Sequence, residues 1–155
     1  MLLYLIQHGE AKKEEEDIKR PLNEKGVEDV NRTGRFLEYN KISVNRILHS
    51  TKLRAKQTAE ILVKYIKVEH GLIEVSGLEP NTDIKEWYEK IIKEENDIAI
   101  VGHLPYLSKL ASKLISGDEN KKIVDFKQGS VLCLEKQIDN LFVIKFFILP
   151  EILQK

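Results

Sequence analysis

The hydrophobic residues of the chain begin with an unbroken apolar run, Leu2–Ile6. A short run of this kind, followed closely by Gly9, favours a strand that is buried on both faces, as in a parallel sheet. Residues 97–102 repeat the pattern, because four apolar residues again lead into a glycine. Ligands of open α/β sheets bind at the carboxyl ends of the strands, so we expect both runs to end at one functional edge.

Four further segments carry apolar residues at the spacing of an α-helix, and we interpret their apolar stripes as core. They are residues 24–39, the stretch from Ala55 to Ile66, the stretch from Ile84 to Ile92 and the stretch from Leu107 to Ile115. The expected helix ends are Asn23, then Ser50 or Thr51, then Thr82 or Asp83 as N-caps, with Pro105 at the first position of the fourth helix and Gly117 after its end.

Shorter apolar segments complete the predicted sheet. Ile47-Leu48 leads to His49 and Ser50, and a further strand is expected near Leu72–Val75. Residues 130–135 and 141–149 are separated by a short link, which implies a hairpin and an antiparallel strand at the edge of the sheet. We find no linker or repeat that divides the chain, so residues 1–155 are expected to form a single domain.

Composition excludes several classes of function. Hydrophobic residues make up 42% and charged residues 32% of the 155 positions, which is typical of a soluble globular protein. Lys plus Arg and Asp plus Glu are both 25, so the electrostatic case for nucleic-acid binding is absent. No apolar run is long enough to span a membrane or to act as a signal peptide. The single cysteine, Cys133, lies among apolar residues and favours a buried thiol in a reducing cytoplasm.

Three candidate functional side chains are expected to converge at the predicted functional edge of the sheet. His8 and His103 follow the two buried strands, and Arg54 falls in the first turn of the second helix. Arginine at a helix N-terminus opposes the helix dipole unless an anion such as phosphate is bound there. Arginine does not ligate metals, and the carboxylates Glu10 and Glu79 show no metal-binding spacing. A neutral histidine beside an arginine and a second, protonated histidine therefore favours phosphoryl transfer onto histidine.

Five short motifs carry these residues. They are His8-Gly9, Arg20-Pro21-Leu22, Ser50-x-x-x-Arg54-Ala55-x-Gln57-Thr58-Ala59, Leu78-x-Pro80 and Gly102-His103-Leu104-Pro105. Together they resemble the histidine phosphatase superfamily, and within it the small phosphohistidine phosphatases of the SixA type. The resemblance implies a phosphoglycerate mutase-like fold: a doubly wound, mostly parallel α/β sheet with helices on both faces. It implies no cofactor and no metal.

The resemblance also implies roles for individual residues. His8 would form a phosphohistidine intermediate, and Arg54 and His103 would bind the phosphate. Gln7 stands where the family has arginine before the nucleophile, and it offers amide donors without the charge. Arg20 is expected to compensate if its loop folds over the pocket. Glu79 is a candidate proton donor.

The expected activity is removal of phosphate from phosphohistidine on a protein, as part of signal transduction in the cytoplasm. Two alternatives remain open at this point. Gln7 would favour a phosphate- or partner-binding module with reduced or lost turnover, and a small phosphorylated molecule could replace the protein as substrate. The oligomeric state is not predicted.

Overall fold

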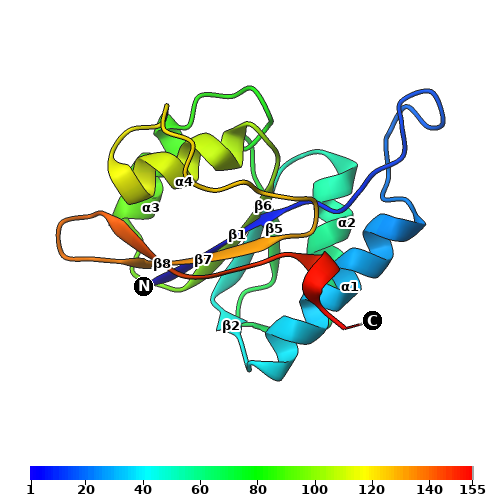
Figure 1. Cartoon of the computed structure of the whole chain (residues 1–155), viewed down its shortest axis with the longest axis horizontal. Coiled ribbons are helices and arrows are strands. Elements are labelled where there is room, and N and C mark those ends of the chain that lie inside the picture. The colour runs from blue at the N-terminus through cyan, green and yellow to red at the C-terminus, as the bar shows by residue number, and fades with distance from the viewer. Residues whose placement is uncertain (155) are drawn as a thin grey trace.

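The computed structural model describes residues 1–154 and centres on a six-stranded sheet with the order β5-β3-β6-β1-β7-β8 (Figure 1). The strands are β1 (Leu2–Gln7), β3 (Arg46–His49), β5 (Leu72–Glu74), β6 (Ile98–Gly102), β7 (Val131–Lys136) and β8 (Phe142–Ile148). The first four of these run parallel. The antiparallel pairing predicted for the sheet edge is present, because β7 runs antiparallel to both β1 and the edge strand β8.

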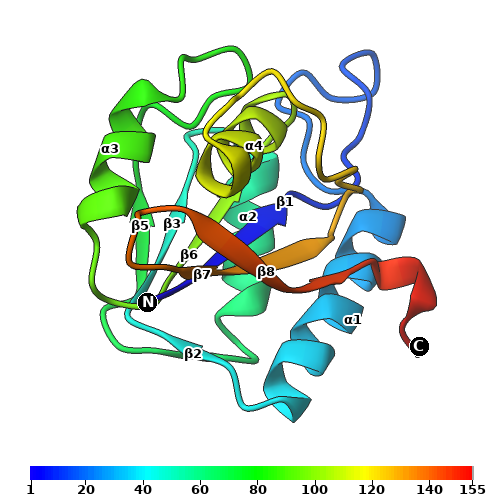
Figure 2. The ribbon, with the colours of Figure 1, turned by 60° about the vertical axis from the view of Figure 1, so that its left-hand side comes forward.

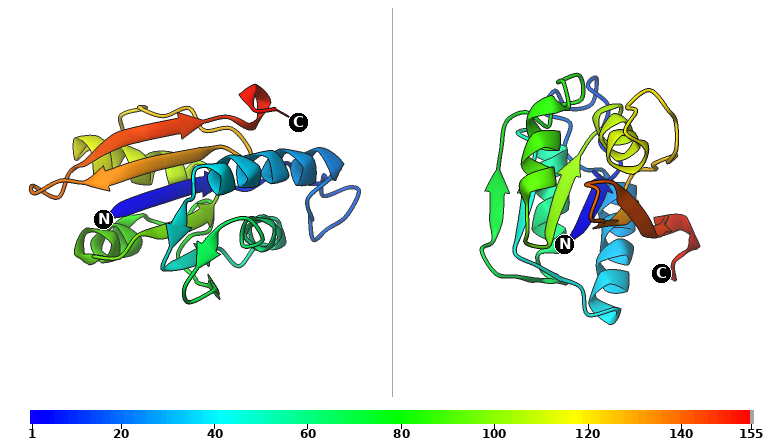
Figure 3. Two further views of the ribbon diagram at one scale, coloured as in Figure 1. Left: turned by 90° about the horizontal axis from the view of Figure 1, so that it is seen from below. Right: turned by 90° about the vertical axis from the view of Figure 1, so that its left-hand side faces the viewer.

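Four helices cover the two faces of this sheet, and they are α1 (Glu24–Tyr39), α2 (Leu53–Leu62), α3 (Lys85–Lys93) and α4 (Tyr106–Ser116). Helices α1 and α2 pack on one face through Val30, Leu37 and Ala59. Helices α3 and α4 pack on the other through residues such as Ile91 and Leu110. The two further views show the helices on either side of the strands (Figures 2 and 3). The predicted fold, an α/β sheet with helices on both faces, is therefore confirmed.

Helix α1 has the predicted bounds, and Asn23 caps it by accepting a hydrogen bond from the backbone N–H of Gly26. The predicted cap of α2 was wrong, because Lys52 occupies the N-cap position and the Ser50 hydroxyl contacts His103 instead. This helix also ends at Leu62 rather than near Ile66.

The starts of the other two helices need smaller corrections. Ile84 occupies the N-cap position of α3, although the Asp83 carboxylate still accepts from the Lys85 N–H. Pro105 is the N-cap of α4 rather than its first residue, and Gly117 ends this helix in the left-handed conformation as predicted.

Small elements that the hydrophobic pattern did not predict surround the sheet. Strands β2 (Ser43–Val44) and β4 (Lys67–Val68) form a two-stranded parallel pair, and a short 3-10 helix, η1 (Pro150–Ile152), follows β8. The red C-terminal segment ends beside α1 (Figure 2). Between β1 and α1, the blue segment forms a loop that extends away from the sheet (Figure 1). None of the helices in residues 1–154 has the length and apolar character needed to cross a membrane.

Candidate active site

The carboxyl ends of β1 and β6 bring His8 and His103 together. The two strands are parallel neighbours in which Gln7 pairs with Gly102, so the residues that follow them lie side by side. The His8 N–H donates to the Gly102 carbonyl over 3.0 Å, and the two imidazole centroids are 4.9 Å apart. The convergence predicted from the two strand-glycine patterns is thus present.

The His8 ring is held in one tautomer by its own neighbour. Its Nδ1 lies 2.6 Å from the Gly9 carbonyl, which can only accept, so Nδ1 carries the proton and Nε2 keeps a free lone pair. Burial, opposed by the hydrogen bond to Gly9 and assisted by the charges of Arg54 and Arg20, lowers the pKa of His8 to about 4. The side chain is therefore a neutral imidazole near pH 7, as a nucleophile requires.

His103 is the more deeply buried of the two histidines, with 1% of its surface exposed. Its Nε2 lies 2.5 Å from the Ser50 hydroxyl, and its buried Nδ1 has no hydrogen-bond partner. Burial, and then the charges of neighbouring groups, lower the pKa of His103 to about 3. The predicted protonated state is therefore not met in the free protein, because the ring would be a buried cation among other cations.

Arg54 lies in the first turn of α2, as predicted, and its side chain is half-buried. The Nε atom is buried without a partner, and burial followed by the charge of Arg20 lowers the pKa of its guanidinium. A guanidinium N–H without an acceptor, next to the free N–H groups of a helix start, is suited to an anion.

Gln7 ends β1 beside the two histidines and is 7% exposed. Its backbone is fixed by two bonds, since its N–H donates to Ser130 and its carbonyl accepts from Gly129. The side-chain Oε1 is buried without a partner. A glutamine amide at this position lacks both the positive charge and the forked set of donors of an arginine side chain.

Arg20 lies on the loop between β1 and α1, where its backbone has a φ of 48°. Its Nε donates to the Lys12 carbonyl over 3.1 Å. The charge of Arg20 lowers the pKa of His8, Arg54 and His103, which places its guanidinium within electrostatic reach of all three.

Two residues that sequence reasoning did not single out hold the site from α2. The Thr58 hydroxyl accepts from the Gly9 N–H over 3.0 Å and donates to the Arg54 carbonyl. The Gln57 side chain accepts from the Leu22 N–H over 2.8 Å, which ties the Arg20 loop to the helix. Both residues belong to the motif that carries Arg54, and this motif was the only available signal.

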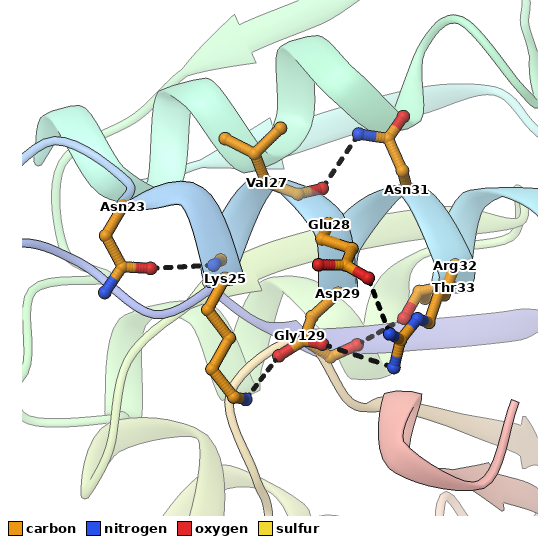
Figure 4. A network of polar contacts seen from close by, with 10 residues as sticks. Asn23, Lys25, Val27, Glu28, Asp29, Asn31, Arg32, Thr33 and Gly129 are labelled. Carbon is orange, nitrogen blue, oxygen red and sulfur yellow. Dashed lines mark hydrogen bonds and ion pairs between the residues drawn. The ribbon is translucent and has the colours of Figure 1, made fainter. Parts of the chain in front are cut away.

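Helix α1 also contacts the site, through the turn before β7 (Figure 4). The Thr33 hydroxyl donates to the Gly129 carbonyl over 2.7 Å. In turn the Gly129 N–H donates to the carbonyls of Gln7, at 2.9 Å, and His8, at 3.2 Å. Around Thr33, ion pairs Lys25–Asp29 and Arg32–Glu28 stabilise the helix surface.

Glu79 lies in the loop before α3 and contacts the start of α2. Its carboxylate accepts from the Thr51 hydroxyl, the Thr82 hydroxyl and the Gly77 N–H. Hydrogen bonds from its own backbone and then from Gly77 and the hydroxyls lower the pKa of Glu79 against the opposing effect of burial. An ionised carboxylate that already accepts three bonds is poorly suited to the predicted role of proton donor.

The arrangement as a whole brings arginine side chains and two buried histidines together at one edge of the sheet. Arg54 Nε and His103 Nδ1 are buried without hydrogen-bond partners, and Arg20 adds positive charge. A phosphoryl group would supply the missing acceptors and lie against His8. Within residues 1–154, no group of three or more His, Cys, Asp or Glu side chains could hold a metal ion. The buried Cys133 is likewise remote from this chemistry, in the core as predicted.

Known proteins share both the sequence pattern and the fold. Residues 3–90 match the family model of the histidine phosphatase superfamily (branch 1). Phosphohistidine phosphatase SixA of Escherichia coli (strain K12) is 25% identical over 123 residues, covering 76% of each chain. A structure of the protein histidine phosphatase SixA complexed with tungstate matches with a TM-score of 0.85, 19% identity and 97% coverage of both chains. The alpha-ribazole phosphatase from Shigella flexneri matches with a TM-score of 0.71, 17% identity and coverage of 97% and 96%.

Proposed function

Because this chain belongs to the histidine phosphatase superfamily, we propose that it is a phosphatase that removes phosphate from phosphohistidine on a protein. The observation that carries the proposal is the His8 ring. Its Nδ1–H is committed to the Gly9 carbonyl, which leaves the Nε2 lone pair free beside the anion-binding groups.

The first chemical step transfers the phosphoryl group to the protein. His8 Nε2 attacks phosphorus, a P–N bond to His8 forms, and the P–N bond to the substrate histidine breaks. The electron pair of the broken bond stays on the departing nitrogen of the substrate imidazole. The other ring nitrogen carries a proton taken from solvent. Arg54, His103 and Arg20 would stabilise the negative charge on the phosphoryl oxygens during this transfer.

The second step returns His8 to its starting state. Water attacks phosphorus, loses a proton to the solution, and the P–N bond to His8 breaks with its electron pair returning to Nε2. The bond from Nδ1–H to Gly9 holds throughout, so the ring does not need to change tautomer between the two steps. Inorganic phosphate is the product.

The leaving group favours phosphohistidine over a phosphate ester as substrate. A protonated imidazole departs from phosphorus readily, whereas an alkoxide needs a proton from an acid placed beside it. Glu79, the carboxyl predicted for that task, has a lowered pKa and three hydrogen-bond donors around it. A substrate that needs no such acid fits this site best, and the 25% identical SixA relative is named for that substrate.

Gln7 supports a second candidate, a phosphate-binding module with little or no turnover. Loss of one charge-assisted hydrogen bond costs about 1.5–3 kcal/mol, which slows a reaction roughly ten- to a hundredfold. The buried Oε1 of Gln7 is an acceptor that cannot bind a phosphate oxygen, so only the uncharged amide N–H groups of Gln7 are left to donate to one. Phosphate release and phosphate binding therefore both have to be measured on the same protein.

The test is phosphate release from a phosphohistidine peptide by the wild type, His8→Ala and His70→Ala. His70 is an exposed histidine outside the site, so His70→Ala is the matched control. We expect release and transient acid-labile labelling of the wild type and the control, and neither in His8→Ala.

Other outcomes separate the alternatives. An inert wild type that binds phosphate and gains turnover as Gln7→Arg would identify a binding module. Faster release from small phosphate esters than from the peptide would contradict the phosphohistidine assignment and leave a small-molecule phosphomonoesterase.

A further inference from the structure

Ser50 follows β3 at the functional edge, is fully buried, and contacts the His103 ring. Its hydroxyl oxygen lies 2.5 Å from His103 Nε2 and 3.3 Å from the backbone N of Lys52. A backbone N–H can only donate, so the Lys52 contact uses a lone pair of the hydroxyl oxygen. The hydroxyl proton is then free for the imidazole.

The Ser50 hydroxyl and the His103 imidazole can share their protons in two ways, and the two ways have different consequences for an anion. If Nε2 carries the proton, the unpartnered Nδ1 is a buried lone pair, which repels a phosphate oxygen. If the Ser50 hydroxyl donates to Nε2, the proton lies on Nδ1, which becomes a buried donor without an acceptor. Only the second arrangement turns the orphaned nitrogen into a phosphate ligand.

We propose that Ser50 is a positioning residue that donates to His103 Nε2 and thereby makes Nδ1–H the group that His103 offers to the phosphate. This inference rests on the proposed function only in that phosphate binds at this site. Ser50 does not touch the phosphate, and it acts through the histidine. The hydroxyl can also accept, so it continues to hold the ring if a bound anion draws a second proton onto Nε2.

A mirrored pattern links the two histidines. In His8, a carbonyl acceptor holds Nδ1–H and leaves Nε2 as a nucleophile. In His103, a hydroxyl donor holds Nε2 and leaves Nδ1–H as a hydrogen-bond donor. The two rings, 4.9 Å apart, are thus held in the same Nδ1–H tautomer by opposite kinds of partner, and each leaves a different nitrogen free for the phosphate.

The experiment is ¹⁵N NMR of the histidine side chains, with inorganic phosphate as the probe, in the wild type, Ser50→Ala, Ser50→Thr and Thr51→Ala. Thr51 is the neighbouring hydroxyl, and it contacts Glu79 instead of the histidine, so its removal is the matched control. Thermal unfolding of each variant separates a lost fold from a lost tautomer.

In the wild type and Thr51→Ala we expect a protonated Nδ1 and an unprotonated Nε2 on His103, with Nδ1 responding to phosphate. In Ser50→Ala we expect the Nε2–H tautomer to gain population and phosphate affinity to fall roughly tenfold, the effect of losing one charge-assisted bond. Ser50→Thr keeps the hydroxyl and should restore the wild-type tautomer.

An unchanged His103 tautomer and unchanged phosphate affinity in folded Ser50→Ala would overturn the proposal, as would a wild-type ring protonated on Nε2. If Ser50→Thr fails to fold, the comparison of Ser50→Ala with Thr51→Ala decides alone. Neither readout needs turnover. A protein that shows the tautomer effect but releases no phosphate from phosphohistidine would therefore contradict the proposed function and support this inference.

Discussion

The Nε2 of His103 lies 2.5 Å from the Ser50 hydroxyl, at a site where both side chains are almost entirely removed from water. Burial, and then the charges of neighbouring groups, keep this histidine neutral in the free protein by lowering its pKa to about 3. The positive charge that an anion meets on entry comes instead from the two arginines, Arg54 and Arg20.

Acid should unfold this protein through its two active-site histidines. Burial lowers the folded pKa of His8 to about 4 and of His103 to about 3, below the unfolded value of 6.5. The unfolded chain binds more protons below pH 6.5, so stability is full above that pH and is lost as pH falls toward 4 and 3. Circular dichroism against pH should show a lower acid midpoint for His103→Gln, and an unchanged one for His70→Ala. Identical midpoints for all three proteins would contradict the assignment.

Arg20 should contribute more to phosphate affinity in this protein than it would in the Gln7→Arg variant. We expect Arg20→Ala to weaken phosphate binding roughly ten- to a hundredfold, the effect of losing one charge-assisted contact. In the Gln7→Arg background, the same change should cost less, because the second guanidinium supplies the missing charge. Calorimetric titration with phosphate over this double-mutant cycle measures the coupling. Lys19→Ala removes a neighbouring exposed charge as the control, and additive effects in the cycle would argue against compensation.

Thr58 should affect both stability and turnover through Gly9. Thr58→Val keeps the shape of the side chain and removes the acceptor for the buried Gly9 N–H, which costs about 1–3 kcal/mol of unfolding free energy. Because Gly9 supplies the carbonyl that fixes His8, phosphate release should fall as well. Thr58→Ser keeps the hydroxyl and should retain most of both. Urea unfolding and peptide turnover measure the two effects. Equal behaviour of the valine and serine variants would contradict this role of the Thr58 hydroxyl.

Two glycines with the same backbone angle provide a test of the turn before β7. Gly129 and Gly117 both have a φ of 80°, so alanine at either costs about 1 kcal/mol in conformational strain. At Gly117 a Cβ would meet nothing within 4 Å, whereas at Gly129 it would lie 3.0 Å from Pro150 Cγ. We expect Gly117→Ala to lose stability alone and Gly129→Ala to lose turnover too, because Gly129 donates to the His8 carbonyl. Normal turnover in a folded Gly129→Ala would show that this bond does not position His8.

Local sequence signals were sufficient where the partners are near in the chain. The bounds of α1 could be predicted because Asn23 caps it through the Gly26 N–H, three residues on. The apolar run of β1 similarly indicated a strand with both faces covered, and its end placed His8 correctly at the sheet edge. These features depend on spacing within one segment.

Other features depend on partners that are distant in the chain, and spacing could not reveal them. Ser50 or Thr51 was expected to cap α2, but the Ser50 hydroxyl contacts His103, which follows the distant strand β6. Gln57 and Thr58 hold the loop and the glycine of another segment, so their importance is visible only in the fold. The lowered pKa of His103 is likewise first a result of burial, which depends on the packing of the whole fold and not on spacing within one segment.

The position of β1 in the sheet has a consequence for synthesis on the ribosome. This strand is translated first, yet its two neighbours are β6, Ile98–Gly102, and β7, Val131–Lys136. A nascent chain therefore carries the strand that leads to His8 without either partner until most of the polypeptide has emerged. Contacts of such long sequence separation form slowly and leave unpaired strand edges exposed in the meantime. The arrangement also means that His8 and His103 come together only after β6 has been made and has paired with β1.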